Sequence, residues 1–274
     1  MWTLSGFAEE ICADLDQQCD VIAELGLNFL EFRSAWGMNI LDLDHHQLTR
    51  AQRTMSARDL CVSTIGSPIG KIPIEADFEP HLRRMRHAAE VARFFEAPFV
   101  RVFSFFIPEG SDPDDHRDEV LRRMSALAKV AEKEEVVLLH ENGKGIYGDI
   151  PRRCLDLVES VSSAHLKIAW DPANFVQVGV RPYAEAFALL RPYLGYVQIK
   201  DAVLSTGELV TAGNGDAEVV ETVRALHQGG FDGFFSVEPP VSPAHASGGS
   251  SSALFTDAWQ AITDILHREH IPFV

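Results

Sequence analysis

Short apolar runs alternate with longer amphipathic segments along all 274 residues, and this alternation constrains the fold more than any other feature. Short apolar runs bounded by turn residues indicate buried strands, whereas apolar residues at three- and four-residue spacing indicate helices. We predict strands at 2–7, 27–32, 61–66, 98–104, 136–141, 166–171, 195–200 and 233–238. We predict helices at 14–25, 45–59, 78–95, 114–134, 151–161, 182–192, 216–229 and 252–268.

Eight β/α units in a chain of this length favour a closed α/β structure, the (β/α)8 or TIM barrel, over an open doubly wound sheet. An open sheet that binds a dinucleotide would usually carry G-x-G-x-x-G after its first strand, and residues 4–8 show nothing similar. A hydrophobic content of 46% is enough to build one large core. We therefore predict a single domain over 1–274, with the Ser/Gly-rich stretch 247–252 forming a loop near the barrel mouth.

Residues at the helix boundaries support this division. Asp14, Asp114 and Asp216 lie at expected helix starts, where a carboxylate accepts hydrogen bonds from free backbone N–H groups. Gly26 and Gly230 follow expected helix ends, where a left-handed backbone conformation is needed.

Charge and cysteine content restrict the partners and the compartment. The formal net charge of -16 would repel a polyanion, so we expect no nucleic-acid partner. The four cysteines show no C-x-x-C spacing, which predicts neither a disulfide nor a structural zinc site. No window approaches the roughly 18 apolar residues of a membrane span, so we expect a cytoplasmic protein without membrane contact. A homo-oligomer is compatible with the fold, although no motif identifies an interface.

Acidic or amide side chains fall at the C-terminal tips of four successive predicted strands: Glu141, Asp171, Gln198 and Glu238. Chemistry in a β/α barrel takes place at these strand ends, because the βα loops meet there. Carboxylates that converge in one pocket repel each other unless a cation lies among them, which predicts one bound divalent metal ion. Any single one of these residues is equally well explained as a helix cap or loop residue, but four successive strand ends favour a shared site.

Several segments of the chain carry a family resemblance. They are residues 67–74, 101–110, 139–148, 170–175, 197–202, 212–216 and 236–239. The sequence resembles the sugar phosphate isomerase/epimerase family with the xylose isomerase-like TIM barrel, which includes ketose 3-epimerases and inosose dehydratases. The resemblance runs from Phe7 to about Pro239, and it is specific for the superfamily rather than for a substrate.

The resemblance implies a ligand set for the metal. Members of the family hold one divalent cation with a Glu, an Asp, a His and a Glu from the last four strands. The matching residues here are Glu141, Asp171 and Glu238, with Gln198 where His is expected. An amide oxygen is a harder and weaker ligand than imidazole, which shifts the preference from zinc-like ions toward magnesium, manganese or calcium. The sequence also departs from the family pattern at Gly143, Asn214 and Pro240.

The implied activity is isomerisation or epimerisation of a small sugar, sugar phosphate or related polyol ketone through an enediolate. The metal would stabilise the enediolate, while Glu141 and Glu238 would remove and return the proton. Two alternatives remain open: an inosose-type dehydratase, which uses the same enolate, and a degenerate barrel that binds sugar without turnover.

Further polar residues near the strand ends are candidates for substrate binding: Asn142, Lys144, Asn174, Lys200 and Arg101. For the last two, a structural salt bridge is an equal alternative. His140 should point away from Glu141 by strand alternation, which predicts a structural histidine. The segment Gly213–Asp216 predicts either a phosphate cradle of backbone N–H groups or a tight turn that ends in a helix cap.

Overall fold

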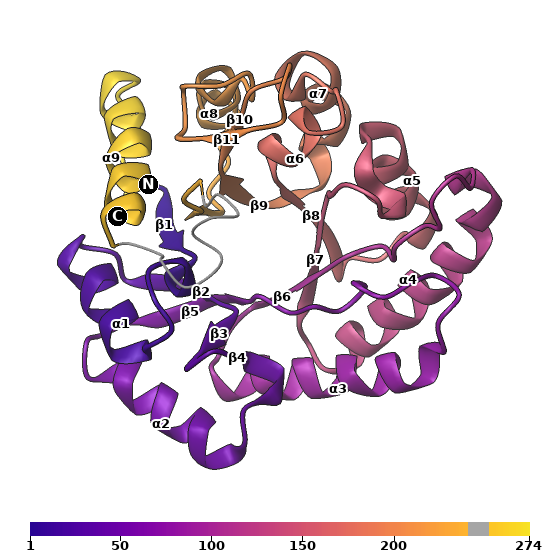
Figure 1. Cartoon of the computed structure of the whole chain (residues 1–274), viewed down its shortest axis with the longest axis horizontal. Coiled ribbons are helices and arrows are strands. Elements are labelled where there is room, and N and C mark those ends of the chain that lie inside the picture. The colour runs from indigo at the N-terminus through magenta and orange to yellow at the C-terminus, as the bar shows by residue number, and fades with distance from the viewer. Residues whose placement is uncertain (241–251) are drawn as a thin grey trace.

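The computed structural model describes residues 1–240 and 252–274, so the loop predicted at 247–252 lies almost wholly outside the described residues. Eight parallel strands form one sheet in the order β1-β12-β9-β8-β7-β6-β5-β2. Their bounds are β1 Thr3–Gly6, β2 Phe29–Phe32, β5 Cys61–Ile65, β6 Phe99–Val102, β7 Val137–Glu141, β8 Leu166–Trp170, β9 Leu194–Ile199 and β12 Phe234–Val237. A parallel bridge between Phe7 and Glu31 joins the two edges of the sheet, so it curves into a barrel (Figure 1).

Helices surround the strands as an outer layer (Figure 1). They are α1 Leu15–Glu24, α2 His45–Ser56, α3 Phe78–Phe94, α4 Arg117–Lys133, α5 Pro151–Val161, α6 Pro172–Val176, α7 Ala188–Leu190, α8 Val219–Gln228 and α9 Ser252–Arg268. The predicted α/β barrel is thus confirmed. Within the described residues, no helix combines the length and the apolar character that a bilayer-spanning segment needs.

Two of the loops at the barrel mouth each contain a short antiparallel strand pair. The strands β3 Ser34–Ala35 and β4 Met38–Asn39 form a hairpin after β2, and β10 Asp201–Ala202 pairs with β11 Leu209–Val210 after β9. The segment predicted as a helix at 182–192 is instead a π-helical turn at Pro182–Phe187, then α7, then a 3-10 turn at Arg191–Tyr193. Proline lacks the backbone N–H that a regular helix interior requires, so Pro192 stops the α-helix from continuing past Leu190.

The helix-boundary predictions were partly right. Asp14 caps α1, since its Oδ1 accepts a hydrogen bond from the Gln17 N–H at 3.1 Å. Gly26 and Gly230 adopt positive φ angles of 77° and 71° after their helices, as expected.

Two of the predicted caps were wrong. Asp114 lies inside a 3-10 turn at Pro113–His116, and Asp112 caps that turn, because the chain begins to coil before α4 starts. Asp216 lies too far ahead of α8, and its carboxylate accepts a hydrogen bond from the Leu204 N–H at 2.7 Å instead. The residue directly before α8 is Glu218, which has a left-handed backbone and no capping hydrogen bond from its side chain.

The barrel interior is closed by apolar side chains. Leu139, Ala169 and Tyr196 form a buried cluster, against which Phe99 and Phe234 pack. These residues come from five neighbouring strands and fill the space that a hollow barrel would leave. Polar chemistry inside the barrel is therefore confined to the layer nearer the C-terminal strand ends.

The N- and C-terminal residues meet at the end of the barrel opposite the mouth. Trp2 forms a parallel bridge with Phe273, and the Leu4 N–H donates to the Val274 carbonyl at 2.8 Å. The two termini lie side by side next to β1 (Figure 1). Since Trp2 precedes β1, this contact lies where the strands begin and away from the mouth.

Candidate active site

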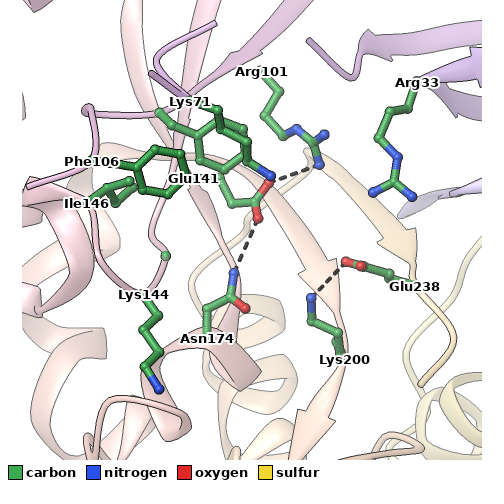
Figure 2. Close-up of a pocket in the computed structure, with 12 residues that line it drawn as sticks. Arg33, Lys71, Arg101, Phe106, Glu141, Lys144, Ile146, Asn174, Lys200 and Glu238 are labelled. Carbon is green, nitrogen blue, oxygen red and sulfur yellow. Dashed lines mark hydrogen bonds and ion pairs between the residues drawn. The ribbon is translucent and has the colours of Figure 1, made fainter. Parts of the chain in front are cut away.

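A polar pocket with a volume of about 270 Å³ opens at the C-terminal ends of the strands (Figure 2). Its lining residues are Arg33, Lys71, Arg101, Phe103, Phe106, Glu141, Gly143, Lys144, Ile146, Asn174, Lys200 and Glu238. Five of these are basic and only two are acidic. The pocket is therefore positive at its walls even though the whole chain carries a charge of -16.

Strand alternation explains why these particular side chains meet. Side chains two residues apart on a strand point to the same face. On β9, Tyr196 belongs to the apolar cluster, so Gln198 and then Lys200 follow it toward the mouth. On β7, Leu139 belongs to the same cluster, so Glu141 follows it. The polar layer is thus built directly on the apolar floor.

Lys200 bridges two of the predicted acidic residues. Its Nζ lies 3.0 Å from Asp171 Oδ2 and 3.0 Å from Glu238 Oε2. Burial alone would lower the pKa of this ammonium group, but the carboxylates of Asp171 and Glu238 outweigh burial and raise it. Lys200 is therefore a fixed positive charge between the two acids.

The two acids respond differently to this shared partner. Burial raises the pKa of Asp171 to about 6, against the opposing pull of Lys200. Burial also acts to raise the pKa of Glu238, but Lys200 and Arg33 outweigh it and hold that pKa below its usual range. Glu238 is consequently the more acidic of the two groups.

Glu141 is held by one ion pair and two hydrogen bonds. Its Oε2 lies 3.0 Å from Arg101 Nη1 and accepts a hydrogen bond from Gln198 Nε2 at 3.2 Å. Its Oε1 accepts one from Asn174 Nδ2 at 3.2 Å. The Oε1 atom of Gln198 is buried and has no hydrogen-bond partner among the described residues. The amide thus presents its donor, not its acceptor, to Glu141.

Deeper in the barrel, Arg101 also contacts Glu31, with 3.4 Å between Nη1 and Oε1. Burial raises the pKa of Glu31 to about 8, and the partial compensation comes from Arg101. Arg33 pairs with Glu9 and Glu10 rather than with Glu31.

The structure gathers four of the five predicted substrate-binding residues in the pocket: Lys144, Asn174, Lys200 and Arg101. Asn142 is the exception. Its side chain is fully buried and exchanges two hydrogen bonds with the backbone of Asp171, at 2.8 and 3.0 Å. It joins the ends of β7 and β8 and does not reach the pocket, so the substrate contact expected from its position is withdrawn.

Sequence reasoning missed several pocket residues. Lys71 comes from the loop after β5, and its Nζ lies 4.1 Å from the centre of the Phe103 ring. Burial and the nearby Arg101 lower the pKa of Lys71 to about 8. Phe106 and Ile146 form an apolar wall beside it (Figure 2). The available signal was the Ser-Pro-Ile-Gly-Lys-Ile-Pro segment at 67–73, whose lysine follows a strand end.

The segment Gly213–Asp216 is neither a phosphate cradle nor a helix cap. Asp201 fills the position that a phosphate would take, because its carboxylate accepts hydrogen bonds from the N–H groups of Gly213 and Gly215 at 2.9 and 3.0 Å. Its other oxygen accepts from the N–H groups of Ala202 and Ala217 at 2.8 and 2.9 Å. The backbone N–H groups of the loop that could bind a phosphate are therefore already occupied by the Asp201 carboxylate.

His140 lies on the outward side of β7, in agreement with the alternation argument. It is fully buried, its Nε2 lies 2.9 Å from Ser104 Oγ, and burial lowers its pKa to about 3. This histidine is neutral and structural.

A closed β/α barrel with its polar side chains at the C-terminal strand ends is the architecture of an enzyme-type barrel. The family model described as xylose isomerase-like TIM barrel matches residues 19–258, and the chain belongs to this family. No curated protein matches the chain significantly in sequence.

Solved structures share the fold at low sequence identity. A D-tagatose 3-epimerase-like protein has a TM-score of 0.80 at 17% identity, with 98% of both chains covered. The probable 3-DHS dehydratase AsbF from Bacillus anthracis has a TM-score of 0.77 at 17% identity, covering 96% of this chain and 98% of that one. The IOLI protein with a bound zinc atom has a TM-score of 0.77 at 13% identity, covering 97% and 99%. At such identities the likeness shows the fold alone.

A divalent metal occurs in the family fold, but the residues of this chain do not fit one as they lie. Across residues 1–240 and 252–274, no three His, Cys, Asp or Glu side chains form a cluster able to hold a metal ion. Gln198 Oε1 and Asp171 Oδ2 are buried and have no hydrogen-bond partner among the described residues, so both are possible ligand atoms. Glu141, Asp171 and Glu238 nevertheless each lie at ion-pair distance from a basic side chain. The three carboxylates that would bind the metal ion are paired with Arg101 and Lys200 instead.

Proposed function

We propose that this protein isomerises or epimerises a small carbohydrate by moving a proton at the carbon next to a carbonyl group. The observation that carries the proposal is the placement of two carboxylates, Glu141 and Glu238, on opposite sides of one polar pocket (Figure 2). A substrate carbon held between them has a carboxylate on each side, so one can remove the proton next to the carbonyl group and the other can carry a proton to the opposite side.

Glu238 is the better placed to begin as the base. Lys200 and Arg33 hold its pKa below the usual range, so it is ionised at neutral pH. Glu141 stands on the other side of the pocket, where Asn174 and Gln198 orient its two oxygens. Glu238 holds the removed proton and gives isomerisation by returning it to the neighbouring carbon. Epimerisation instead needs Glu141 to deliver a proton taken from solvent to the opposite side of the same carbon, after which Glu238 releases its own proton to solvent.

Fixed cations would stabilise the enediolate as its charge develops. Lys200 and Arg101 are held in place by the acids around them, and preorganised charges of this kind act without reorganising during the reaction. No step is assigned to a divalent ion, because the carboxylates that would bind one are paired with these cations.

An anionic group on the substrate fits the remaining part of the pocket. Lys71 and Lys144 line it, and neither makes an ion pair with any described residue. A phosphate or carboxylate at the far end of a ketose would supply the missing partner. The proposed substrate is thus a sugar phosphate or sugar acid rather than a neutral sugar.

The test is deuterium incorporation from solvent into a panel of phosphorylated and neutral ketoses, followed by NMR. We expect incorporation next to the carbonyl, reduced at least about 100-fold by Glu238→Gln and by Glu141→Gln. The matched control is Glu134→Gln, which removes a carboxylate that pairs with Arg93 on the surface. Incorporation that survives both pocket variants would refute the acid–base assignment, and no incorporation into any ketose would refute the proposal itself.

Dehydration is the second candidate, because a neighbour of the same fold is a probable dehydratase. It would use the same enolate but expel a hydroxyl group from the next carbon. Mass spectrometry of the product separates the two reactions, since only dehydration lowers the mass by one water.

A further inference from the structure

The position of Lys200 bears on whether this barrel uses a metal at all. Its Nζ is 3.0 Å from Asp171 Oδ2 and 3.0 Å from Glu238 Oε2, so these two oxygens share one protein cation. Both acids belong to the ligand set that the family resemblance implies. An ion bound to the same two oxygens would lie within a few ångströms of the ammonium group, and the like charges would repel strongly in this buried place.

The third implied acid is engaged in the same manner. Arg101 lies 3.0 Å from Glu141 Oε2, and the Nε2 of Gln198 donates to the same oxygen. A metal ligand must offer a free lone pair to the ion. Gln198 therefore acts on Glu141 as a donor, which a neutral histidine bound to a metal could not do at the same nitrogen.

Burial makes the arrangement difficult to rearrange. Asp171 is fully buried, and Lys200 and Arg101 are only 7% and 4% exposed. Moving the ammonium group aside to admit an ion would leave a buried charge without its partners, which is costly. The pairing is therefore part of the folded structure and not a loose surface contact.

We propose that the Lys200 ammonium group takes the place of the divalent cation, so that the centre is independent of metal. Lys200 pairs with both Asp171 and Glu238, and Glu238 also lines the pocket. The inference concerns the same pocket as the proposed function, but it is tested by metal binding, so the two can fail separately.

The experiment is titration of the chelator-treated full chain with Mn²⁺, followed by electron paramagnetic resonance and by thermal unfolding. We expect the wild type to bind no Mn²⁺ more tightly than about 1 mM. Lys200→Met removes the charge and keeps the apolar stem, so it should gain at least about tenfold in Mn²⁺ affinity and be stabilised by the ion. The proposal would be overturned if the wild-type chain bound one Mn²⁺ at micromolar concentration and Asp171→Asn abolished that binding. This outcome does not depend on whether Lys200→Met folds.

Two control variants sharpen the result. Lys71→Met removes a basic group of the same pocket that pairs with no carboxylate in residues 1–240 and 252–274, so it should gain no Mn²⁺ affinity. Gln198→His supplies the imidazole found in the family but leaves Lys200 in place, so it too should gain none. A gain in either control, or no gain in folded Lys200→Met, would show that the ammonium group is not what excludes the ion.

Discussion

Substituting Asp201 measures how much its carboxylate stabilises the loop after β9. Its carboxylate accepts four backbone hydrogen bonds, two at each oxygen, from Ala202, Gly213, Gly215 and Ala217. Asp201→Asn keeps one oxygen but turns the other into an NH₂ group that faces two N–H donors. Each hydrogen bond to a charged group contributes roughly 1.5–3 kcal/mol, so losing two should lower the free energy of unfolding by about 3–6 kcal/mol.

The measurement is urea unfolding at neutral pH, followed by circular dichroism. Asp216→Asn in the same loop is the matched control, because that carboxylate accepts one hydrogen bond in an exposed position, and we expect a loss of about 1 kcal/mol or less. Comparable unfolding slopes in urea would show that both variants start from the same folded state. A loss below about 1 kcal/mol for Asp201→Asn would refute the idea that the carboxylate organises the loop.

Two further predictions concern acid stability and substrate charge. Burial lowers the pKa of His81 to about 4, and its Nε2 accepts a hydrogen bond from the Gly70 N–H at 2.6 Å. The unfolded chain therefore binds the proton first, so the free energy of unfolding should fall by up to about 3 kcal/mol as the pH drops from about 6.5 to 4. His140, whose pKa burial lowers to about 3, adds a fall of the same sign. Urea unfolding across this range should therefore show a steeper fall in the wild type than in His81→Gln, the difference being the part due to His81. For the pocket, Lys71→Met should weaken the binding of a phosphorylated ketose by about tenfold and leave a neutral ketose nearly unchanged, as measured by calorimetry. Equal weakening of both ligands would contradict an anion contact at Lys71.

The eight β/α units were predictable because their signal is local. The periodicity of apolar residues depends only on neighbours along the chain, so the strands and most helices begin and end close to the predicted residues. The caps were less predictable, since Asp112 and Asp114 are equally good capping residues in isolation. Which of them serves depends on where Pro113 starts the turn, and this is settled by the path of the whole loop.

The position of the candidate site at the barrel mouth was predictable, but the pairings between its side chains were not. The C-terminal ends of β7 and β12 place Glu141 and Glu238 at the mouth, and strand alternation predicts which face their side chains point to. Whether Lys200 turns toward Asp171 depends on side-chain directions across neighbouring strands, and no spacing in the sequence encodes these. The same limit applies to Asp201, whose four donors come from a loop that folds back over it.

The bridge between Trp2 and Phe273 has a practical consequence for handling the protein. A fusion partner or affinity tether joined at Met1 or Val274 would leave from the end of the barrel where the strands begin. A protein attached to a sensor chip by either terminus would therefore present its active-site pocket to the solution. Because the ends already touch, a short peptide linking them and a new opening cut in an outer loop should yield a circular permutant that still folds.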